Sequence, residues 1–209
     1  MKILYVIMHT QNQSGRYDNV MNTWGGDVDC IFYSDHEDLN KNIIKTSDDS
    51  TYKSNEEKFC NVVNLIPEKY QDYDWFLFCD NDTFVNTKLL AKEVVNFDEN
   101  MVYGQILNTY RSDTSLFYVS GGAGKLVSNK VLQLIKNKVT NKKTTYADVT
   151  FGYALRDLNV SIKDHPKFKS QAPEFYGIND IDIPFFITFH YIKTIELMQK
   201  LYNITNEIL

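Results

Sequence analysis

Short apolar runs alternate along this chain with segments of helical periodicity, and no other feature restricts its fold as strongly. Near-continuous apolar runs that contain β-branched residues are typical of parallel strands covered on both faces. Three such runs predict strands at 2–8 (KILYVIM), 28–34 (VDCIFYS) and 75–79 (WFLFC).

The segments between and after these runs carry apolar residues on one helical face. They predict helices at 56–70, 87–97 and 128–139, with Thr87 and Ser128 as N-caps. Alternating strands and helices predict an α/β fold with a mostly parallel, Rossmann-like sheet flanked by helices. We expect loops at 35–55 and 165–184. Because no linker or repeat divides the 209 residues, we expect one domain, 1–209.

Composition and charge restrict the function. The formal net charge is −5, which argues against a protein that holds nucleic acid by neutralising its phosphates. An acidic protein that binds an anionic ligand needs a metal ion or a local cluster of basic groups. Cys30, Cys60 and Cys79 lie among apolar neighbours, which predicts buried free thiols rather than disulfides. No run is long enough for a membrane helix, and the N-terminus lacks a basic signal region, so we expect a cytoplasmic location, in a cell or in a host cell.

Asp80-Asn81-Asp82 follows the third predicted strand directly. This position is the carboxyl edge of a parallel sheet, where α/β proteins bind ligands. Two carboxylates there suit a hard divalent cation that also takes oxygens from a diphosphate. The spacing of residues excludes three other kinds of site. A haloacid-dehalogenase-type phosphatase would need Thr where the chain has Phe84, and an EF-hand would need Gly where it has Val85. A Walker A loop with Lys125 as its lysine would need Ser or Thr at the position of Leu126.

Three further segments carry chemistry. Residues 118–124 (YVSGGAG) predict a strand end and a small-residue turn into a helix, in which Gly121 and Gly122 let backbone N–H groups approach a ligand. Asp148 lies at the start of a helical segment and is either a helix N-terminal acid or a base. His190 and Lys193 are three residues apart, which predicts one helical face that offers a metal ligand and a phosphate contact.

Taken in order, these segments resemble the fringe and core 1 galactosyltransferase group of β3-glycosyltransferases, which have the GT-A fold. The resemblance covers about residues 16–193. Its motifs are Arg16 with Thr23-Trp24, 32–35 (FYSD), 74–85 (DWFLFCDNDTFV), 120–124 (SGGAG), Asp148 with Gly152, and 189–191 (FHY).

The resemblance implies a transferase that moves a hexosyl or deoxyhexosyl unit from a UDP-sugar to a glycan or glycoprotein hydroxyl, with inversion. It implies Mn²⁺, with Mg²⁺ as the alternative. Asp80, Asp82 and His190 match the metal-binding positions, with Asp80 also near the ribose and sugar, and Asp148 matches the general base.

By position, Thr10, Arg16 and Asp35 are expected to hold the uridine, Gly121 and Gly122 the donor, and Lys193 the diphosphate. We expect residues 1–100 to form the donor half and 101–209 the acceptor half.

The chain also departs from the family pattern. Ala147 stands where the family often has a first acid, and 168–171 (FKSQ) replaces a Phe-His-Ser-His stretch. The family's disulfides and membrane anchor are absent from this sequence, which points to a bacterial or large-DNA-virus relative.

Several alternatives stay open from sequence. These are a retaining GT-A transferase, a metal-dependent sugar-nucleotide hydrolase or nucleotidyltransferase that would share Asp80 and Asp82, and a sugar-binding module without activity.

Aromatic residues make up 14% of the chain. Those inside the apolar runs are predicted to be core: Phe32, Tyr33, Trp75, Phe76 and Phe78. Those in or beside the predicted site loops are candidates for stacking on sugar rings: Tyr110, Phe117, Tyr118, Phe175, Tyr176 and Tyr191.

Overall fold

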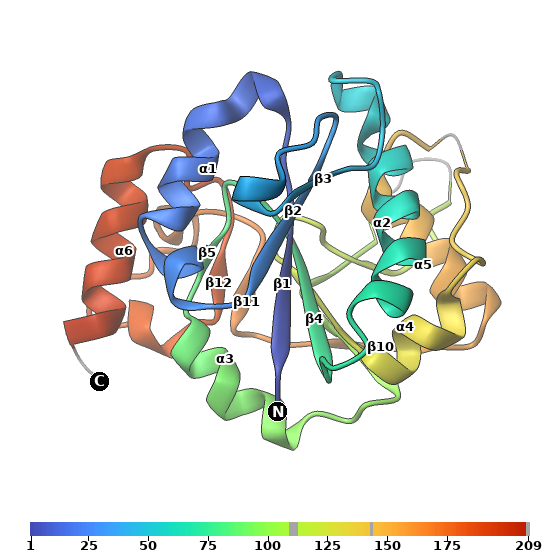
Figure 1. Cartoon of the computed structure of the whole chain (residues 1–209). Helices are drawn as coiled ribbons and strands as arrows, with labels where there is room; N and C mark the ends of the chain where they lie inside the picture. Colours follow the sequence, from blue (N-terminus) through green and yellow to red (C-terminus); the bar gives the residue numbers. More distant parts are fainter. Residues whose placement is uncertain (109–112, 143, 208–209) are drawn as a thin grey trace.

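A computed structural model describes residues 1–108, 113–142 and 144–207, and its centre is one twisted sheet (Figure 1). The seven strands lie in the order β10-β6-β9-β4-β1-β2-β3. Every adjacent pair is parallel except those made by β9, which runs antiparallel to both β4 and β6. The strands are β1 (Ile3–Met8), β2 (Cys30–Ser34), β3 (Ile43–Lys45), β4 (Trp75–Asp80), β6 (Met101–Gly104), β9 (Lys125–Ser128) and β10 (Ser161–Asp164).

Side-chain alternation along the strands builds a separate apolar core on each face of this sheet. On β1, Leu4 and Val6 belong to one core and Tyr5 and Ile7 to the other. This explains why the central strands are apolar at nearly every position. The mostly parallel α/β sheet predicted from the sequence is confirmed.

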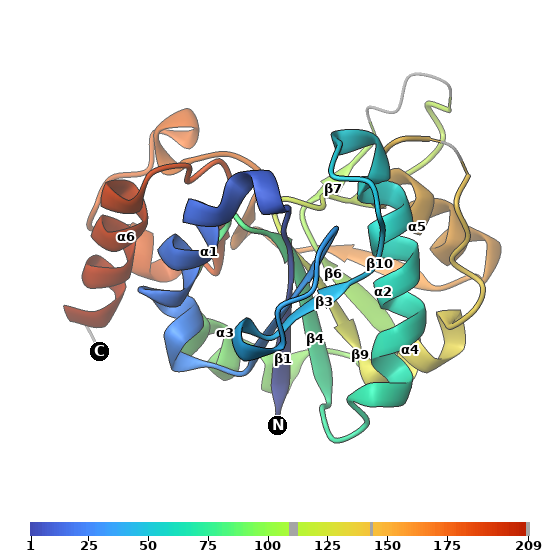
Figure 2. The ribbon, with the colours of Figure 1, turned by 45° about the horizontal axis from the view of Figure 1, so that its top comes forward.

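Helices cover both faces (Figures 1 and 2). Apolar residues of α2 (Asn55–Lys69), α4 (Asn129–Ile135) and α5 (Ala147–Asp157) pack in one core. Those of α1 (Ser14–Met21), α3 (Thr87–Glu93) and α6 (Ile195–Glu207) pack in the other. Among the described residues, no helix is long and apolar enough to cross a membrane.

Two small sheets lie beside the carboxyl ends of the central strands. One has the order β11-β12-β5, with β5 (Phe84–Val85), β11 (Phe168–Lys169) and β12 (Thr188–Phe189). The other pairs β7 (Ile106–Leu107) with β8 (Tyr118–Val119). The first is important for the site because it joins the segment after β4 to a segment about one hundred residues later.

Several local predictions were wrong. The glycine turn after β8 leads into strand β9 and not into a helix, so the sheet gains its antiparallel member there. Asn86 rather than Thr87 caps α3, because its side chain accepts a hydrogen bond from the N–H of Leu89. Ser128 does cap α4 through the N–H of Val131, but that helix ends at Ile135 instead of continuing to 139.

The predicted loop at 35–55 contains the edge strand β3, and the predicted loop at 165–184 contains β11. The three cysteines are buried and free, as predicted. The five aromatic residues assigned to the core are all buried. Tyr110, a stacking candidate, lies outside the described residues.

Candidate active site

The acidic turn leaves the carboxyl end of β4, and its middle residue anchors it. Asn81 is 2% exposed. Its side-chain NH₂ group lies 3.1 Å from both His9 Nδ1 and Gln13 Oε1, and its oxygen accepts a hydrogen bond from Arg16. Because Asn81 points into the protein, the carboxylates on either side of it face a common space.

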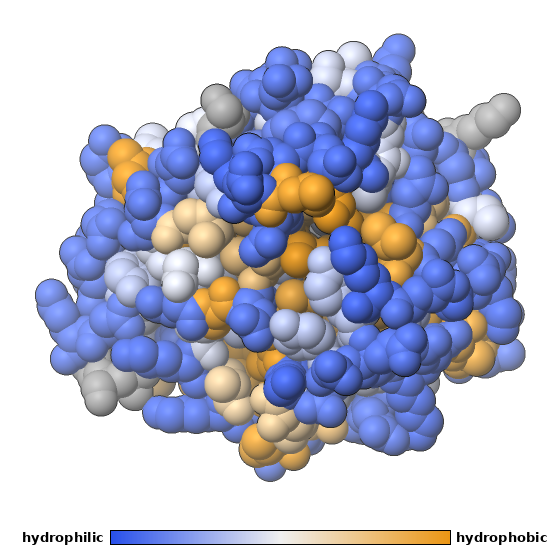
Figure 3. Space-filling view, viewed as in Figure 1, coloured by the Kyte–Doolittle hydropathy of each residue, from blue (hydrophilic) through white to orange (hydrophobic). Residues whose placement is uncertain are grey.

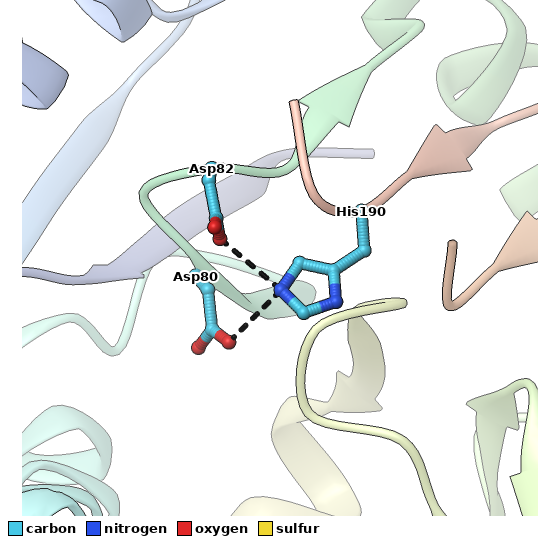
Figure 4. A group of neighbouring side chains, drawn as sticks. All are labelled: Asp80, Asp82 and His190. Carbon is cyan, nitrogen blue, oxygen red and sulfur yellow. Dashed lines mark ion pairs between the residues drawn. The ribbon is translucent and has the colours of Figure 1, made fainter. Parts of the chain in front are cut away.

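A second part of the chain brings His190 to this turn. Strand β12 pairs antiparallel with β5, which follows the acidic turn, and this pairing sets Phe189 opposite Phe84. The N–H of Ile192 also donates to the carbonyl of Asp82 at 2.9 Å. His190 therefore faces Asp80 and Asp82 although it lies more than one hundred residues away in sequence (Figure 4).

One ring nitrogen of His190 faces both carboxylates. Its Nε2 lies 3.1 Å from Asp82 Oδ1 and 3.5 Å from Asp80 Oδ2. The other nitrogen, Nδ1, lies 3.3 Å from the carbonyl oxygen of Ser170, so it must be the donor in that hydrogen bond. Burial alone would lower the pKa of His190, but hydrogen bonds to the two carboxylates and their charges raise it to about 9.

For Asp82 the balance is the opposite, because burial alone would raise the pKa of this carboxyl group. Its hydrogen bond with His190 and the charges of His190 and Arg16 outweigh burial and lower it.

This cluster fits a divalent cation. One ligand atom from each of Asp80, Asp82 and His190 lies within 4.8 Å of the others. Carboxylate oxygens suit Mg²⁺ and Mn²⁺, and imidazole is a common ligand of the later transition metals. The hydrogen bond from Nδ1 to a carbonyl is the usual way in which a protein orients a metal-binding imidazole.

Gly122 is required for the position of His190. A Cβ atom on Gly122 would stand 2.2 Å from the Cε1 and Nδ1 atoms of the His190 ring. The carbonyl of Gly122 accepts a hydrogen bond from the Thr83 hydroxyl at 2.8 Å, which links the glycine turn to the acidic turn. The glycines were predicted to admit a ligand to the backbone, and at Gly122 the structure gives that space to the imidazole ring.

Asp148 lies on the far side of the glycine turn, in the first turn of α5. One carboxylate oxygen accepts a hydrogen bond from the N–H of Gly121 at 3.2 Å, and the other from the N–H of Val149 at 2.9 Å. Both bonds leave lone pairs on the carboxylate for a further donor.

Two adjoining pockets meet at Asp80 and His190. The Asp148 pocket has a volume of about 240 Å³ and is also lined by Gly121, Gly122 and Lys125. The Arg16 pocket, about 430 Å³, is also lined by Thr10, Asp82 and Lys193. The cluster of Asp80, Asp82 and His190 therefore stands between a pocket lined by the Asp148 carboxylate and a pocket lined by the cationic side chains of Arg16 and Lys193. On the face seen in Figure 3, the surface is hydrophilic over most of its area, with apolar side chains gathered near the middle.

The structure brings together most of the residues proposed from the sequence. The exception is Asp35, which lines neither pocket. Its carboxylate accepts hydrogen bonds from the N–H of Gln11 and the hydroxyl of Ser34, and lies 3.7 Å from the ammonium of Lys58. In the structure, Asp35 supports the loop after β1 through its hydrogen bond with the backbone N–H of Gln11.

His190 and Lys193 do not share a helical face, as the sequence had predicted. The segment after β12 is irregular, Tyr191 has a positive φ of 62°, and α6 begins only at Ile195. Backbone hydrogen bonds to Lys169 and Asp82 fix this segment, and they are incompatible with a helix. Lys193 reaches the Arg16 pocket all the same, with its ammonium 5.0 Å from the centre of the Tyr191 ring.

Two of the buried charged residues, Glu56 and Lys125, lie close to the Asp148 pocket and were not predicted from the sequence. Glu56, in α2, is 1% exposed and accepts hydrogen bonds from the backbone N–H groups of Lys142 and Thr145 and from the Thr150 hydroxyl. Lys125, at the start of β9, is 3% exposed and lines the Asp148 pocket. In the sequence, Lys125 directly follows the glycine turn, and neither this position nor the surroundings of Glu56 marks a role.

A family model described as Fringe-like matches residues 3–206, nearly the whole chain. The matched residues include Asp80, Asp82 and His190 and the lining of both pockets.

Solved glycosyltransferase structures share the fold. A glycosyltransferase involved in glycosylation of the major capsid of PBCV-1 aligns with a TM-score of 0.57 and 15% identity over 100% of both chains. The glycosyltransferase GlyE of Streptococcus pneumoniae TIGR4 aligns with a TM-score of 0.59 and 14% identity over 99% of this chain and 63% of its own. The bifunctional glycosyltransferase WbbM aligns with a TM-score of 0.52 and 12% identity over 99% of this chain and 51% of its own.

Proposed function

We propose a specific reaction for this chain, which belongs to the Fringe-like family and is a glycosyltransferase of the GT-A fold. The chain transfers a hexosyl or deoxyhexosyl unit from a UDP-sugar, with inversion at the anomeric carbon. We propose that the reaction depends on a divalent cation, Mn²⁺ or Mg²⁺, and that the acceptor is a hydroxyl of a glycan or glycoprotein.

The observation that carries this proposal is the position of the metal-binding cluster between the two pockets. A nucleotide sugar has its charge in the middle, at the diphosphate, with the nucleoside on one side and the sugar on the other. Two pockets that meet at Asp80 and His190 match this layout. The Arg16 pocket is the larger and would take the nucleoside, and the smaller Asp148 pocket would take the sugar.

Cationic side chains support the diphosphate assignment. Arg16 Nη1 lies 3.2 Å from Asp82 Oδ2 and 3.1 Å from the Asn81 side-chain oxygen, so its guanidinium is fixed beside the acidic turn. The sequence had assigned Arg16 to the uridine; because its guanidinium lies beside the acidic turn, we instead propose that Arg16 and Lys193 contact the diphosphate. Thr10, which lines the same pocket, remains the proposed contact for the uridine. Asp35 would act only by supporting the loop that carries Thr10.

Asp80, Asp82 and His190 would hold the cation, which when bound offsets the negative charge of the diphosphate and so makes it a better leaving group. Asp148 is the general base of the proposal: its carboxylate accepts the proton of the acceptor hydroxyl as that oxygen attacks the anomeric carbon. The bond from the Gly121 N–H orients this carboxylate toward the pocket. In this proposal residues 1–100 supply most donor contacts and 101–209 supply the base, while His190 joins the two halves.

A thermal-shift and turnover screen tests the donor assignment. UDP-, GDP- and dTDP-sugars are each measured with Mn²⁺, with Mg²⁺ and with a chelator. We expect UDP compounds to raise the melting temperature with metal, the increase growing with the logarithm of ligand concentration above Kd, and to have no effect with chelator. If no nucleotide shifts the melting temperature in the presence of metal, the donor site is wrongly assigned.

The stereochemistry of transfer is tested separately. The anomeric configuration of the product is read by NMR after a single round of transfer. Inversion is expected if Asp148 activates the acceptor directly. A retained configuration would reject the inverting mechanism but leave the fold and the donor site unaffected.

A further inference from the structure

Lys125 has an unusual place for an ammonium group. It opens strand β9, where its backbone pairs with Phe78, and its side chain lies on the same sheet face as Val127, which belongs to an apolar core. The ammonium lies 4.6 Å from the centre of the Phe59 ring. Burial of a charge among apolar groups costs free energy unless another charge or hydrogen bonds compensate it.

Within the described parts of the chain, no compensating group contacts this ammonium. It makes no hydrogen bond and no ion pair within 4 Å, and its contact is the face of the Phe59 ring. Burial lowers the pKa of Lys125, while the more distant carboxylates of Asp148 and Asp80 raise it. Lys58 provides an internal comparison, because it is equally buried and has the Asp35 carboxylate 3.7 Å away.

The Lys125 side chain lines the Asp148 pocket, whose volume of about 240 Å³ is below the roughly 300–1,000 Å³ of pockets for drug-sized ligands. One monosaccharide unit suits this size better than a whole nucleotide sugar. A Cβ atom on Gly121 would lie 3.2 Å from Lys125 Nζ and 3.8 Å from Asp148 Oδ2. The ammonium and the proposed base therefore both lie close to Gly121, at the wall of the same small pocket.

The diphosphate does not explain this cation. Arg16 and Lys193 line the other pocket, beyond Asp80 and His190, and Lys125 does not. An ammonium has only donors, so in a pocket occupied by the sugar it pairs with acceptor atoms of that sugar, either hydroxyl oxygens or a carboxylate. Among sugar substituents, a carboxylate has only hydrogen-bond acceptors, and its negative charge also compensates the buried positive charge of Lys125.

We propose, on the basis of the proposed function, that Lys125 determines donor specificity and that the transferred hexosyl unit is one oxidised at C6, a hexuronosyl residue, whose carboxylate pairs with the Lys125 ammonium. Asp148 and Lys125 then act on different parts of one sugar: Asp148 beside the reacting centre and Lys125 at the far substituent.

Two matched donor pairs test this proposal. UDP-glucuronate and UDP-glucose differ only at C6, as do UDP-galacturonate and UDP-galactose. Dissociation constants are measured by calorimetry with Mn²⁺ for the wild type and for Lys125→Met, which replaces the charge by an apolar chain of similar length. For at least one pair, we expect the wild type to bind the uronate at least tenfold more tightly than the neutral sugar, and Lys125→Met to bind both within twofold.

Lys193→Met is the matched control. It removes an ammonium from the diphosphate side, so all four donors should weaken by a similar factor and the wild-type preference should persist. UDP alone, with Mn²⁺, reports on the nucleotide and metal sites without a sugar, and its binding to Lys125→Met shows that this variant is folded.

The outcomes separate the two proposals. If UDP fails to bind the wild type with metal, the proposed function itself is wrong. If UDP binds but neither uronate binds more tightly than its neutral partner, the uronate proposal alone is overturned. A preference that survives in Lys125→Met would also overturn it, because the discrimination would then come from another residue.

Discussion

At the scale of single residues, the acidic turn of the site depends on a buried amide whose hydrogen-bonding groups are all paired. This amide belongs to Asn81, which contacts His9, Gln13 and Arg16 and so turns its acidic neighbours toward the pockets. Sequence could identify the two carboxylates by their position after a strand. It could not identify the function of the asparagine between them, since its three partners come together only in the fold.

Two isosteric substitutions separate the roles of the acids. Asp148→Asn removes the proton acceptor, so transfer should fall by about 10²–10⁴-fold while the Kd for UDP with Mn²⁺ stays within about twofold. Asp82→Asn should instead weaken metal-dependent UDP binding by tenfold or more. Calorimetry and turnover assays on both variants check this, and full transfer by Asp148→Asn would remove this residue as the base.

We expect Glu56 to act as a positioning residue for Asp148. Its carboxylate accepts three hydrogen bonds from residues 142–150, which lead into α5 and carry Asp148. Glu56→Gln keeps the shape but sets an NH₂ group against donors, which we expect to cost about 1–3 kcal/mol of stability.

Glu56→Gln should also lower kcat at least fivefold, with the Kd for UDP unchanged. The exposed neighbour Glu57→Gln is the control and should leave kcat unaffected. Urea unfolding and steady-state kinetics measure the two effects, and an unchanged kcat in a destabilised variant would show a purely structural role.

At the scale of elements, the glycine turn between β8 and β9 controls how closely three segments approach. Thr83 donates to this turn, His190 lies against Gly122, and Asp148 accepts from Gly121. The sequence indicated a tight small-residue turn, and this was correct. It also predicted a following helix, which was wrong because residues 125–128 complete the sheet between β4 and β6.

Gly122→Ala tests this arrangement. A methyl group 2.2 Å from the imidazole must displace His190 from the carboxylates, so metal-dependent UDP binding should weaken at least tenfold. Gly15→Ala is the control, because a Cβ there meets nothing within 4 Å and alanine favours the α1 helix. Mn²⁺ titration of both variants in the presence of UDP measures the effect. Equal binding by Gly122→Ala and the wild type would contradict the assignment of His190 as a metal ligand.

At the scale of the whole molecule, the stability of the fold and the geometry of the site are coupled through buried groups. His9 follows β1 and is 2% exposed. Burial, with a contribution from the neighbouring His36, lowers its pKa from 6.5 to about 4. Its neutral Nδ1 can then accept a hydrogen bond from Asn81, which supports the acidic turn.

A pH dependence of stability follows from this shift. Between pH 6.5 and 4 the unfolded chain binds a proton at His9 that the folded protein does not, so the free energy of unfolding falls as the pH is lowered. The loss from His9 should be about 1–3 kcal/mol.

His9→Gln retains an acceptor for Asn81 but does not titrate. Urea unfolding of both proteins at pH 7 and pH 4.5 should show a smaller loss of stability for His9→Gln. Equal losses would mean that His9 is not responsible.

The sequence alone is enough to predict the layers of this protein, because the periodicity of apolar residues decides which elements form and which faces they bury. It also determined that two carboxylates stand at the carboxyl edge of a parallel sheet, since the strand that precedes them is unmistakably apolar. The family resemblance matched His190 to a metal-binding position, but it was the pairing of β12 with β5 that showed its imidazole against Asp80 and Asp82. Likewise, only the folded chain shows that Lys125 and Asp148 line one pocket. These relations join residues far apart in the chain through strand pairing and packing, and no local pattern records such contacts.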